Sequence, residues 1–108
     1  MSRVAVVTGA ARGIGASIAR RLEADGFTVA RLDKNASDGV MAFDLASVET
    51  HDAVVSEIVK RHGPIDCLVN NAGIAALKRG DFIDLEPEAY DAVMGVNARG
   101  TVFFTQAV

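Results

Sequence analysis

Hydrophobic positions along the chain follow two different periods, and their alternation predicts strands separated by helices. Residues 4–7 form a short apolar run rich in β-branched side chains, which is typical of a buried strand. From Gly13 onward the apolar residues recur at helical spacing, and Gly26 follows as a residue that ends helices. Residues 28–32 then predict a second strand that ends at Asp33.

The second half of the chain continues this alternation. Residues 40–43 predict a weaker third strand, and Ser47 is a suitable N-cap for a helix that ends at Gly63. Residues 65–69 predict a fourth strand. Pro87 occupies a favoured first-turn position and opens a last helix that continues to the end of the chain.

The predicted order is strand-helix-strand-strand-helix-strand-helix. This order indicates the α/β class, with a Rossmann-type doubly wound parallel sheet and helices on both of its faces. Ligands of such sheets bind outside the carboxyl ends of the strands. That rule brings together the segments that follow the predicted strands: residues 8–15, Asp33, Asp44 and residues 70–73.

Composition narrows the class of protein. A length of 108 residues suits one domain, and 50% hydrophobic with 23% charged residues is typical of a globular chain. The net charge of −3 and the lack of a basic run argue against nucleic-acid binding. No apolar run is long enough to span a membrane. The single cysteine, Cys67, fits a reducing compartment, and we expect a cytoplasmic protein.

Three glycines lie between the first strand and the first helix. Gly9 allows the chain to turn off the strand, Gly13 has no side chain to block a phosphate, and Gly15 lets the helix approach the sheet. The free N–H groups and the dipole at the helix start would then hold a pyrophosphate. The same glycines would also suit a tight strand-to-helix turn that binds no ligand.

The glycine spacing, together with three further motifs, resembles the short-chain dehydrogenases/reductases. Residues 8–15 follow the pattern Thr-Gly-x-x-x-Gly-Ile-Gly, which differs from the common Gly-x-Gly-x-x-Gly fingerprint. Residues 70–73 (Asn-Asn-Ala-Gly), the pair Asp44-Leu45 and residues 97–100 (Asn-Ala-Arg-Gly) are similar to other motifs of that family. The four motifs occur in the family's order over nearly the whole chain.

The resemblance implies hydride transfer between a nicotinamide cofactor and a small carbonyl or alcohol substrate. It also implies that Asn97 is a catalytic residue, which holds a water in a proton relay to a lysine. From the helical pattern alone, Asn97 is equally well explained as a hydrogen-bonded core residue. The residues expected to bind the cofactor are Gly9, Arg12, Gly13, Ile14, Gly15, Asp33, Asp44, Leu45, Asn71, Ala72 and Gly73.

The choice between NAD and NADP depends on charged side chains near the second strand. The Asp33 carboxylate can accept hydrogen bonds from the ribose hydroxyls of NAD and would repel the 2′-phosphate of NADP. Arg12 and Lys34 are the opposing signal, because either cation would favour that phosphate. We expect NAD, with NADP as the alternative. Without a ligand, Asp33 would be a solvated turn residue.

The family's catalytic tyrosine, with a lysine four residues later, is missing from this sequence. The single tyrosine is Tyr90, and Met94 stands where the lysine would be, so we predict that Tyr90 is a helix-surface or packing residue. We therefore expect residues 1–108 to be an NAD(P)-binding domain that stops before the catalytic segment. The alternative function is a dinucleotide-binding fragment without turnover. The isolated chain should self-associate through its sheet edge, and the full-length protein should form homo-oligomers.

The remaining polar residues have simpler interpretations. His51 and His62 are expected on a helix surface, and Cys67 is expected to be an inert residue of a buried strand. No residues have the spacing of a metal site. We expect Asn70 to tie neighbouring loops through backbone hydrogen bonds, and the loop at residues 75–81 to border the pocket.

Overall fold

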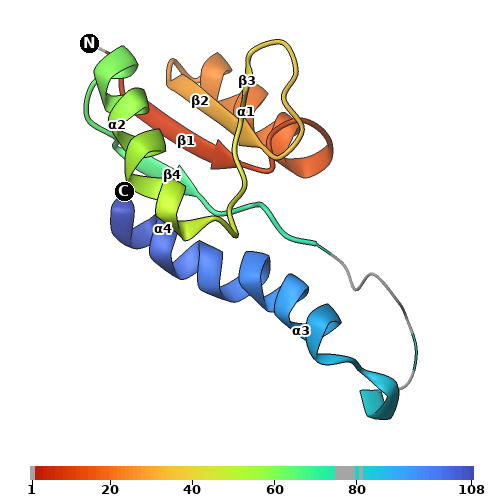
Figure 1. The fold of residues 1–108 in the computed structure, drawn as a ribbon. Coiled ribbons are helices and arrows are strands. Elements are labelled where there is room, and N and C mark those ends of the chain that lie inside the picture. The colour runs from red at the N-terminus through yellow and green to blue at the C-terminus, as the bar shows by residue number, and fades with distance from the viewer. Residues whose placement is uncertain (1, 75–79, 81) are drawn as a thin grey trace.

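The computed structural model describes residues 2–74, 80 and 82–108, and its centre is a parallel four-stranded sheet. The strands are β1 (Val4–Thr8), β2 (Thr28–Asp33), β3 (Val40–Ala42) and β4 (Cys67–Val69). They lie in the order β3-β2-β1-β4 across the sheet (Figure 1). Because the strands are parallel, their carboxyl ends meet at one edge of the sheet, where the predicted ligand segments follow them.

Helices cover both faces of the sheet, as the alternating pattern predicts. One face carries the first helix and the other carries the second helix and the end of the last one (Figure 1). Within the described residues, no helix combines the length and the apolar character needed to cross a membrane. The helices are α1 (Gly13–Ala24), η1 (Val48–Thr50), α2 (His51–His62), η2 (Phe82–Asp84), α3 (Pro87–Met94), η3 (Gly95–Gly100) and α4 (Thr101–Ala107).

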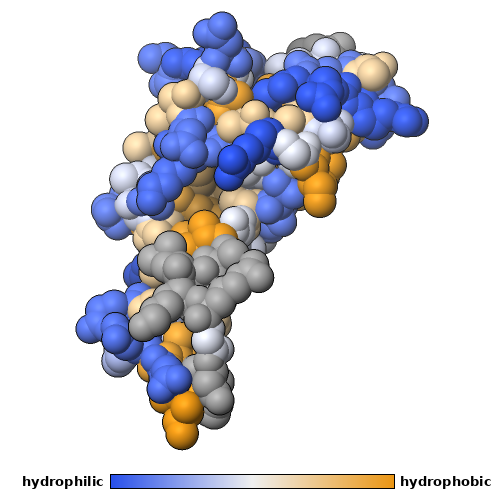
Figure 2. Space-filling model, turned by 90° about the vertical axis from the view of Figure 1, so that its right-hand side faces the viewer, coloured by the Kyte–Doolittle hydropathy of each residue, from blue (hydrophilic) through white to orange (hydrophobic). Residues whose placement is uncertain are grey.

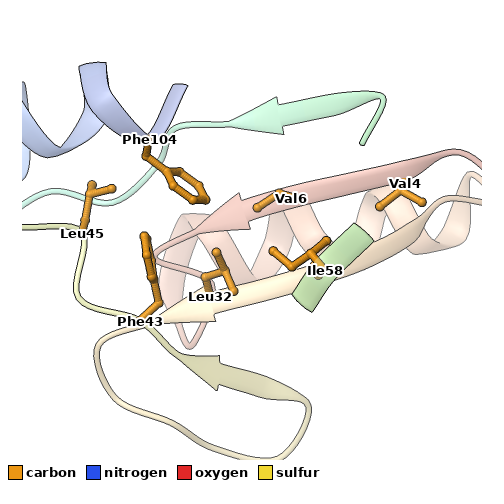
Figure 3. Close-up of a cluster of buried hydrophobic side chains, with 8 residues drawn as sticks. Val4, Val6, Leu32, Phe43, Leu45, Ile58 and Phe104 are labelled. Carbon is orange, nitrogen blue, oxygen red and sulfur yellow. The ribbon is translucent and has the colours of Figure 1, made fainter. Parts of the chain in front are cut away.

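The central strand β1 is buried on both faces, which explains its continuous apolar run. Val6 packs in one cluster with Ile58 of α2 and Phe104 of α4 (Figure 3). Val7 packs in a second cluster with Ala19 of α1 on the opposite face. The sheet and its helices are therefore fixed around β1, and the loop that leaves this strand starts from a rigid base.

The last helix contains a π-helical turn that its sequence pattern did not reveal. The segments α3, η3 and α4 follow one another without a break, but residues Gly95–Gly100 are π-helical. The α3 end extends away from the sheet, whereas α4 packs beside α2 (Figure 1). Single π turns inside helices are frequent at functional sites, and this one contains Asn97.

Two element boundaries differ from the sequence prediction for identifiable reasons. Strand β4 begins only at Cys67, and just before it the Val4 N–H donates to the Asp66 carboxylate, at 2.8 Å, and not to a backbone carbonyl. Ser47 does not cap the next helix, since its hydroxyl donates to Asp44 at 3.3 Å. The helix therefore starts with the 3₁₀ turn η1, and its α-helical part begins at His51.

Apolar side chains are exposed along the last helix and just before it (Figure 2). In addition, β4 forms an edge of the described sheet. The sheet edge was one ground for expecting self-association of this chain, which stays a prediction. The other was an incompletely covered helix face around Val93 and Phe104, but Phe104 is fully buried in the core. The exposed side chains are Ile83, Leu85, Tyr90, Met94, Val102 and Phe103.

Candidate nucleotide-binding site

A cleft of about 390 Å³ lies at the carboxyl ends of the strands. Its walls come from the glycine-rich loop, the end of β2, the turn after β3 and the segment after β4. These are the segments that the strand-end rule brought together from the sequence. The lining residues are Thr8, Gly9, Arg12, Gly13, Leu32, Asp33, Lys34, Asn35, Phe43, Asp44, Leu45, Asn71, Ala72, Gly73, Ile74 and Val96.

Gly9 and Gly15 allow the loop to fold tightly against the start of α1. Gly9 has a φ of 65°, a left-handed conformation that favours glycine. A Cβ atom at Gly15 would overlap the Gly9 carbonyl oxygen and would lie 2.5 Å from the Asn71 amide nitrogen. The predicted packing role of Gly15 is confirmed by this close approach, and Gly15 itself does not line the cleft.

The start of α1 is open toward a ligand. Gly13 has a φ of 60°, and a Cβ atom at this position would meet nothing within 4 Å. Arg12 occupies the N-cap position, but no side chain of the described residues caps the helix there. The first N–H groups of a helix have no partner within the helix. An anion such as a phosphate would satisfy them in the space that Gly13 leaves free.

Asp33 connects the end of β2 to the glycine-rich loop. One oxygen of its carboxylate accepts a hydrogen bond from the Ala11 N–H at 3.1 Å, and the other accepts one from the Asn35 N–H at 3.0 Å. The side chain is thus held at the cleft wall and is not a freely solvated turn residue. Arg12 and Lys34, the opposing cations, line the same cleft.

Asn71, not Asn70, joins the segment after β4 to the glycine-rich loop. The prediction that Asn70 does so was wrong. Asn71 donates from its amide nitrogen to the carbonyl oxygens of Thr8 and Gly9, at 3.2 and 3.1 Å. Asn70 instead donates to the Thr105 hydroxyl of α4 at 3.0 Å. Successive residues that leave a strand point in opposite directions, so only one of the two asparagines can reach β1.

Thr8 is a hydrogen-bonding centre that the sequence pattern did not single out. Its buried hydroxyl oxygen accepts hydrogen bonds from the N–H groups of Asn71 and Ala72, at 3.1 and 3.0 Å, and donates to the Val69 carbonyl at 3.4 Å. It thereby joins the end of β1 to the end of β4. The available signal was a hydroxyl residue that ends an apolar strand directly before Gly9.

Asn97 is hydrogen-bonded as predicted, but its expected interior location was wrong. The side-chain oxygen accepts from the Ile74 N–H at 2.8 Å, and the side-chain nitrogen donates to the Ile74 carbonyl at 2.9 Å. The side chain is exposed, and it lies beside the segment at Gly73 and Ile74. Asn97 therefore holds this segment along the cleft.

Asp44 and Leu45 form the turn at the other end of the cleft. The Asp44 carboxylate accepts from the Ala46 N–H at 3.1 Å and from the Ser47 hydroxyl at 3.3 Å. Leu45 and the neighbouring Phe43 are buried, and both side chains line the cleft. This end of the site is apolar, as a surface for a flat ring should be.

Several other sequence predictions can be judged at the level of single residues. Ile14, which we expected to bind the cofactor, is 74% exposed at the open start of α1 and does not itself line the cleft. Tyr90 is exposed on α3, as predicted. Cys67 is only half-buried, because β4 is an edge strand. Apart from Gly80, the loop at residues 75–81 lies outside the described residues.

The two histidines of α2 have different environments. His62 is exposed, as predicted for both. His51 is only 2% exposed and lies among aromatic rings, so its prediction as a surface residue was wrong. The signal was available, since His51, Val54, Val55 and Ile58 have the spacing of one buried helix face. No three metal-ligating side chains of the described residues are grouped so that they would hold a metal ion.

Comparison with known proteins assigns the family. The sequence model of the family described as short chain dehydrogenase matches residues 3–108. The chain belongs to this family. The match confirms the resemblance carried by the four motifs, and it places the glycine-rich loop in a fold that members of the family share.

Individual members of the family are similar over the whole chain. Acetoacetyl-CoA reductase from Shinella zoogloeoides is 39% identical over 100% of this chain and 48% of its own length. The crystal structure of 3-oxoacyl-[acyl-carrier protein] reductase from Brucella melitensis in complex with NAD is 48% identical, with a TM-score of 0.97, over 100% of this chain and 48% of that one.

A metagenomic short-chain oxidoreductase in complex with NADP is 31% identical, with a TM-score of 0.90, over 99% of this chain and 55% of that one. The chain spans about half the length of the curated relatives it matches, for example 44%, 48% and 50% of them. These similarities confirm the Rossmann-type α/β fold. NAD is bound in the Brucella melitensis structure, and NADP is bound in the metagenomic one.

Proposed function

We propose that residues 1–108 form the nucleotide-binding domain of an NAD(P)-dependent oxidoreductase, which transfers a hydride between a nicotinamide cofactor and a small carbonyl or alcohol substrate. The observation that carries this proposal is the open start of α1 at Gly13, which shares one cleft with Asp33 and Leu45. A dinucleotide needs a phosphate site between two pockets for its nucleosides. The cleft contains the residues for each of these parts.

The residues of the cleft fit the cofactor in order along the sheet edge. The start of α1, with Arg12 and Gly13, would hold the pyrophosphate. Asp33 would accept hydrogen bonds from the adenosine ribose, and Asp44 and Leu45 would border the adenine. The segment at Ala72 and Gly73, with Asn71 at its start, would lie along the nicotinamide half. Gly15 and Ile14 do not line the cleft and would contribute to binding indirectly, by shaping the start of α1 that holds the pyrophosphate.

NAD is the preferred cofactor in this proposal. The Asp33 carboxylate is fixed at the cleft wall by its two backbone donors, so it cannot turn away from a 2′-phosphate without losing them. Two like charges about 4 Å apart repel by roughly 1–4 kcal/mol, depending on screening. Arg12 and Lys34 line the cleft as well and would offset part of this repulsion, so NADP is the weaker ligand of the two.

The chemistry divides between the cofactor and the chain. The nicotinamide supplies or accepts the hydride when it is bound. The chain's residues bind and orient it, and Asn97 fixes the Gly73–Ile74 segment beside it through two hydrogen bonds. The catalytic role of Asn97 in a proton relay, which the family resemblance implies, is part of this proposal. Proton transfer to substrate needs a further group, because Tyr90 lies exposed on α3 with Met94, not lysine, four residues later.

The second candidate function is binding of the dinucleotide without turnover. It is supported by Met94, which stands four residues after Tyr90 where a catalytic lysine would be. One experiment separates the candidates. NADH and NADPH are titrated into the full-length protein with nicotinamide fluorescence as the readout, and oxidation of NADH is then followed with a panel of small carbonyl compounds. Binding with turnover supports the oxidoreductase, and binding without turnover supports the second function. Failure of both nucleotides to bind overturns both candidates.

A further inference from the structure

His51 is a buried imidazole directly behind the wall of the cleft. It is the first residue of α2, where a polar side chain usually meets solvent, yet it is only 2% exposed. Its ring lies 5.4 Å from the ring of Phe43 and 5.2 Å from that of Phe104. Phe43 also lines the cleft, so His51 and a bound nucleotide would lie on opposite sides of Phe43.

The hydrogen bonding of His51 fixes its tautomer. The Nε2 atom lies 2.8 Å from the carbonyl oxygen of Leu45. A carbonyl oxygen only accepts, so Nε2 carries the proton and donates it. The Nδ1 atom is buried and, among the described residues, has no hydrogen-bond partner. The ring is therefore held in one orientation by a single hydrogen bond and by its two aromatic neighbours.

The Leu45 carbonyl is enclosed from a second direction as well. A Cβ atom at Gly100 of the last helix would lie only 2.5 Å from this oxygen. The turn that carries Phe43 and Leu45 is thus held between His51 and the helix backbone at Gly100. Phe43, Leu45 and Phe104 belong to one buried cluster (Figure 3). A shift of this turn would act first on the apolar end of the cleft, because Phe43 and Leu45 line that end and the glycine-rich loop lines the phosphate end.

We propose that His51 is a positioning residue for the adenosine half of the dinucleotide. By donating to the Leu45 carbonyl, it holds the Phe43–Leu45 turn at the spacing that admits an adenine ring. This inference rests on the proposed function, because it assumes that a nicotinamide dinucleotide occupies the cleft. A residue that served stability alone would affect all ligands of the folded protein equally. A positioning residue at this end affects only ligands that contain adenosine.

The test compares half-ligands on the full-length protein. Affinities for NADH, for ADP and for reduced nicotinamide mononucleotide are measured in the unchanged protein, His51→Leu, His51→Gln and the control His62→Leu. His62 is at the exposed end of the same helix. Removing one hydrogen bond of this kind corresponds to a loss of about three- to tenfold in affinity. We expect this loss for NADH and ADP in His51→Leu, partial recovery in His51→Gln, and no change for the mononucleotide or in His62→Leu.

Each outcome has a defined meaning. An unchanged ADP affinity in His51→Leu, or an equal loss for the mononucleotide, would overturn the inference and leave the proposed function standing. A failure of the unchanged protein to bind NADH would overturn the proposed function and the inference together. If His51→Leu does not fold, long-range ¹H–¹⁵N spectra of the unchanged protein decide. We expect a proton on Nε2 of His51 and a shift of its resonance on addition of ADP, and a proton on Nδ1 or an unmoved resonance would overturn the inference.

Discussion

Asp33 accepts a hydrogen bond from the Ala11 N–H at 3.1 Å, and this bond joins the end of β2 to the glycine-rich loop. The residue proposed to select the cofactor therefore also shapes the loop proposed to bind its phosphates. Both effects belong to one carboxylate, so a substitution there should alter affinity as well as selectivity. The two can be separated with a variant that retains an acceptor but loses the charge.

We predict that Asp33→Asn shifts the preference from NADH toward NADPH. The amide oxygen can still accept from Ala11, while the repulsion of a 2′-phosphate, roughly 1–4 kcal/mol, disappears. NADPH should bind about tenfold tighter and NADH more weakly, as measured by fluorescence titration. Asp38→Asn is the control, since Asp38 is exposed and does not line the cleft. Stronger binding of NADPH than of NADH by the unchanged protein would refute the proposed cofactor preference.

The phosphate site can be tested with two glycines of similar conformation. Gly13 and Gly39 have φ angles of 60° and 76°, and a Cβ atom at either would meet nothing within 4 Å, but only Gly13 lines the cleft. Alanine at either site costs about 1–2 kcal/mol of folding stability, because L-residues disfavour this region. We expect both variants to lose stability in urea unfolding, while only Gly13→Ala loses at least about tenfold in NADH affinity. Equal effects on affinity would show that Gly13 is merely a turn residue.

The features that could be predicted from the sequence are those set by local chemistry. Residues 4–7 predict a central strand because a strand buried on both faces must be apolar throughout. Gly9 and Gly15 could be identified because a turn and a close contact leave no room for a side chain. The strand-end rule then brought Asp33 and Asp44 together, and both line one cleft.

The features that escaped prediction depend on contacts between distant segments. Which of two adjacent asparagines reaches the glycine-rich loop is decided by the direction of the chain after Val69, and Asn71 has that direction. The π turn around Asn97 ends at Gly100, where the last helix lies close to Leu45 of a distant segment. His51 was assigned to the surface from its residue type, although its spacing with Ile58 indicated a buried face.

The two adjacent asparagines should differ in their effect on stability. Asn71→Ala removes two hydrogen bonds to the Thr8 and Gly9 carbonyls at the part-buried end of β1. We expect the free energy of unfolding to fall by about 1–3 kcal/mol, because those carbonyls lose their partners. Asn70→Ala removes one bond of an exposed side chain to Thr105 and should cost less than about 1 kcal/mol. Urea unfolding measures both, and an equal cost would contradict the assigned tie.

The π-helical segment contains two glycines whose replacement by alanine should have opposite effects. In a helix, alanine is normally more favourable than glycine by about 1 kcal/mol. At Gly95 the nearest atom to a new Cβ would be the Ala46 Cβ at 3.9 Å, an ordinary contact, so Gly95→Ala should raise stability. At Gly100 the new Cβ would lie 2.5 Å from the Leu45 oxygen and 2.9 Å from its Cγ. The helix or the Phe43–Leu45 turn must then move, and Gly100→Ala should lower stability and weaken ADP binding. Thermal unfolding measures the change in stability of both variants, and ADP titration measures the change in affinity. A stabilised Gly100→Ala would show that the helix is not in tight contact with the Phe43–Leu45 turn.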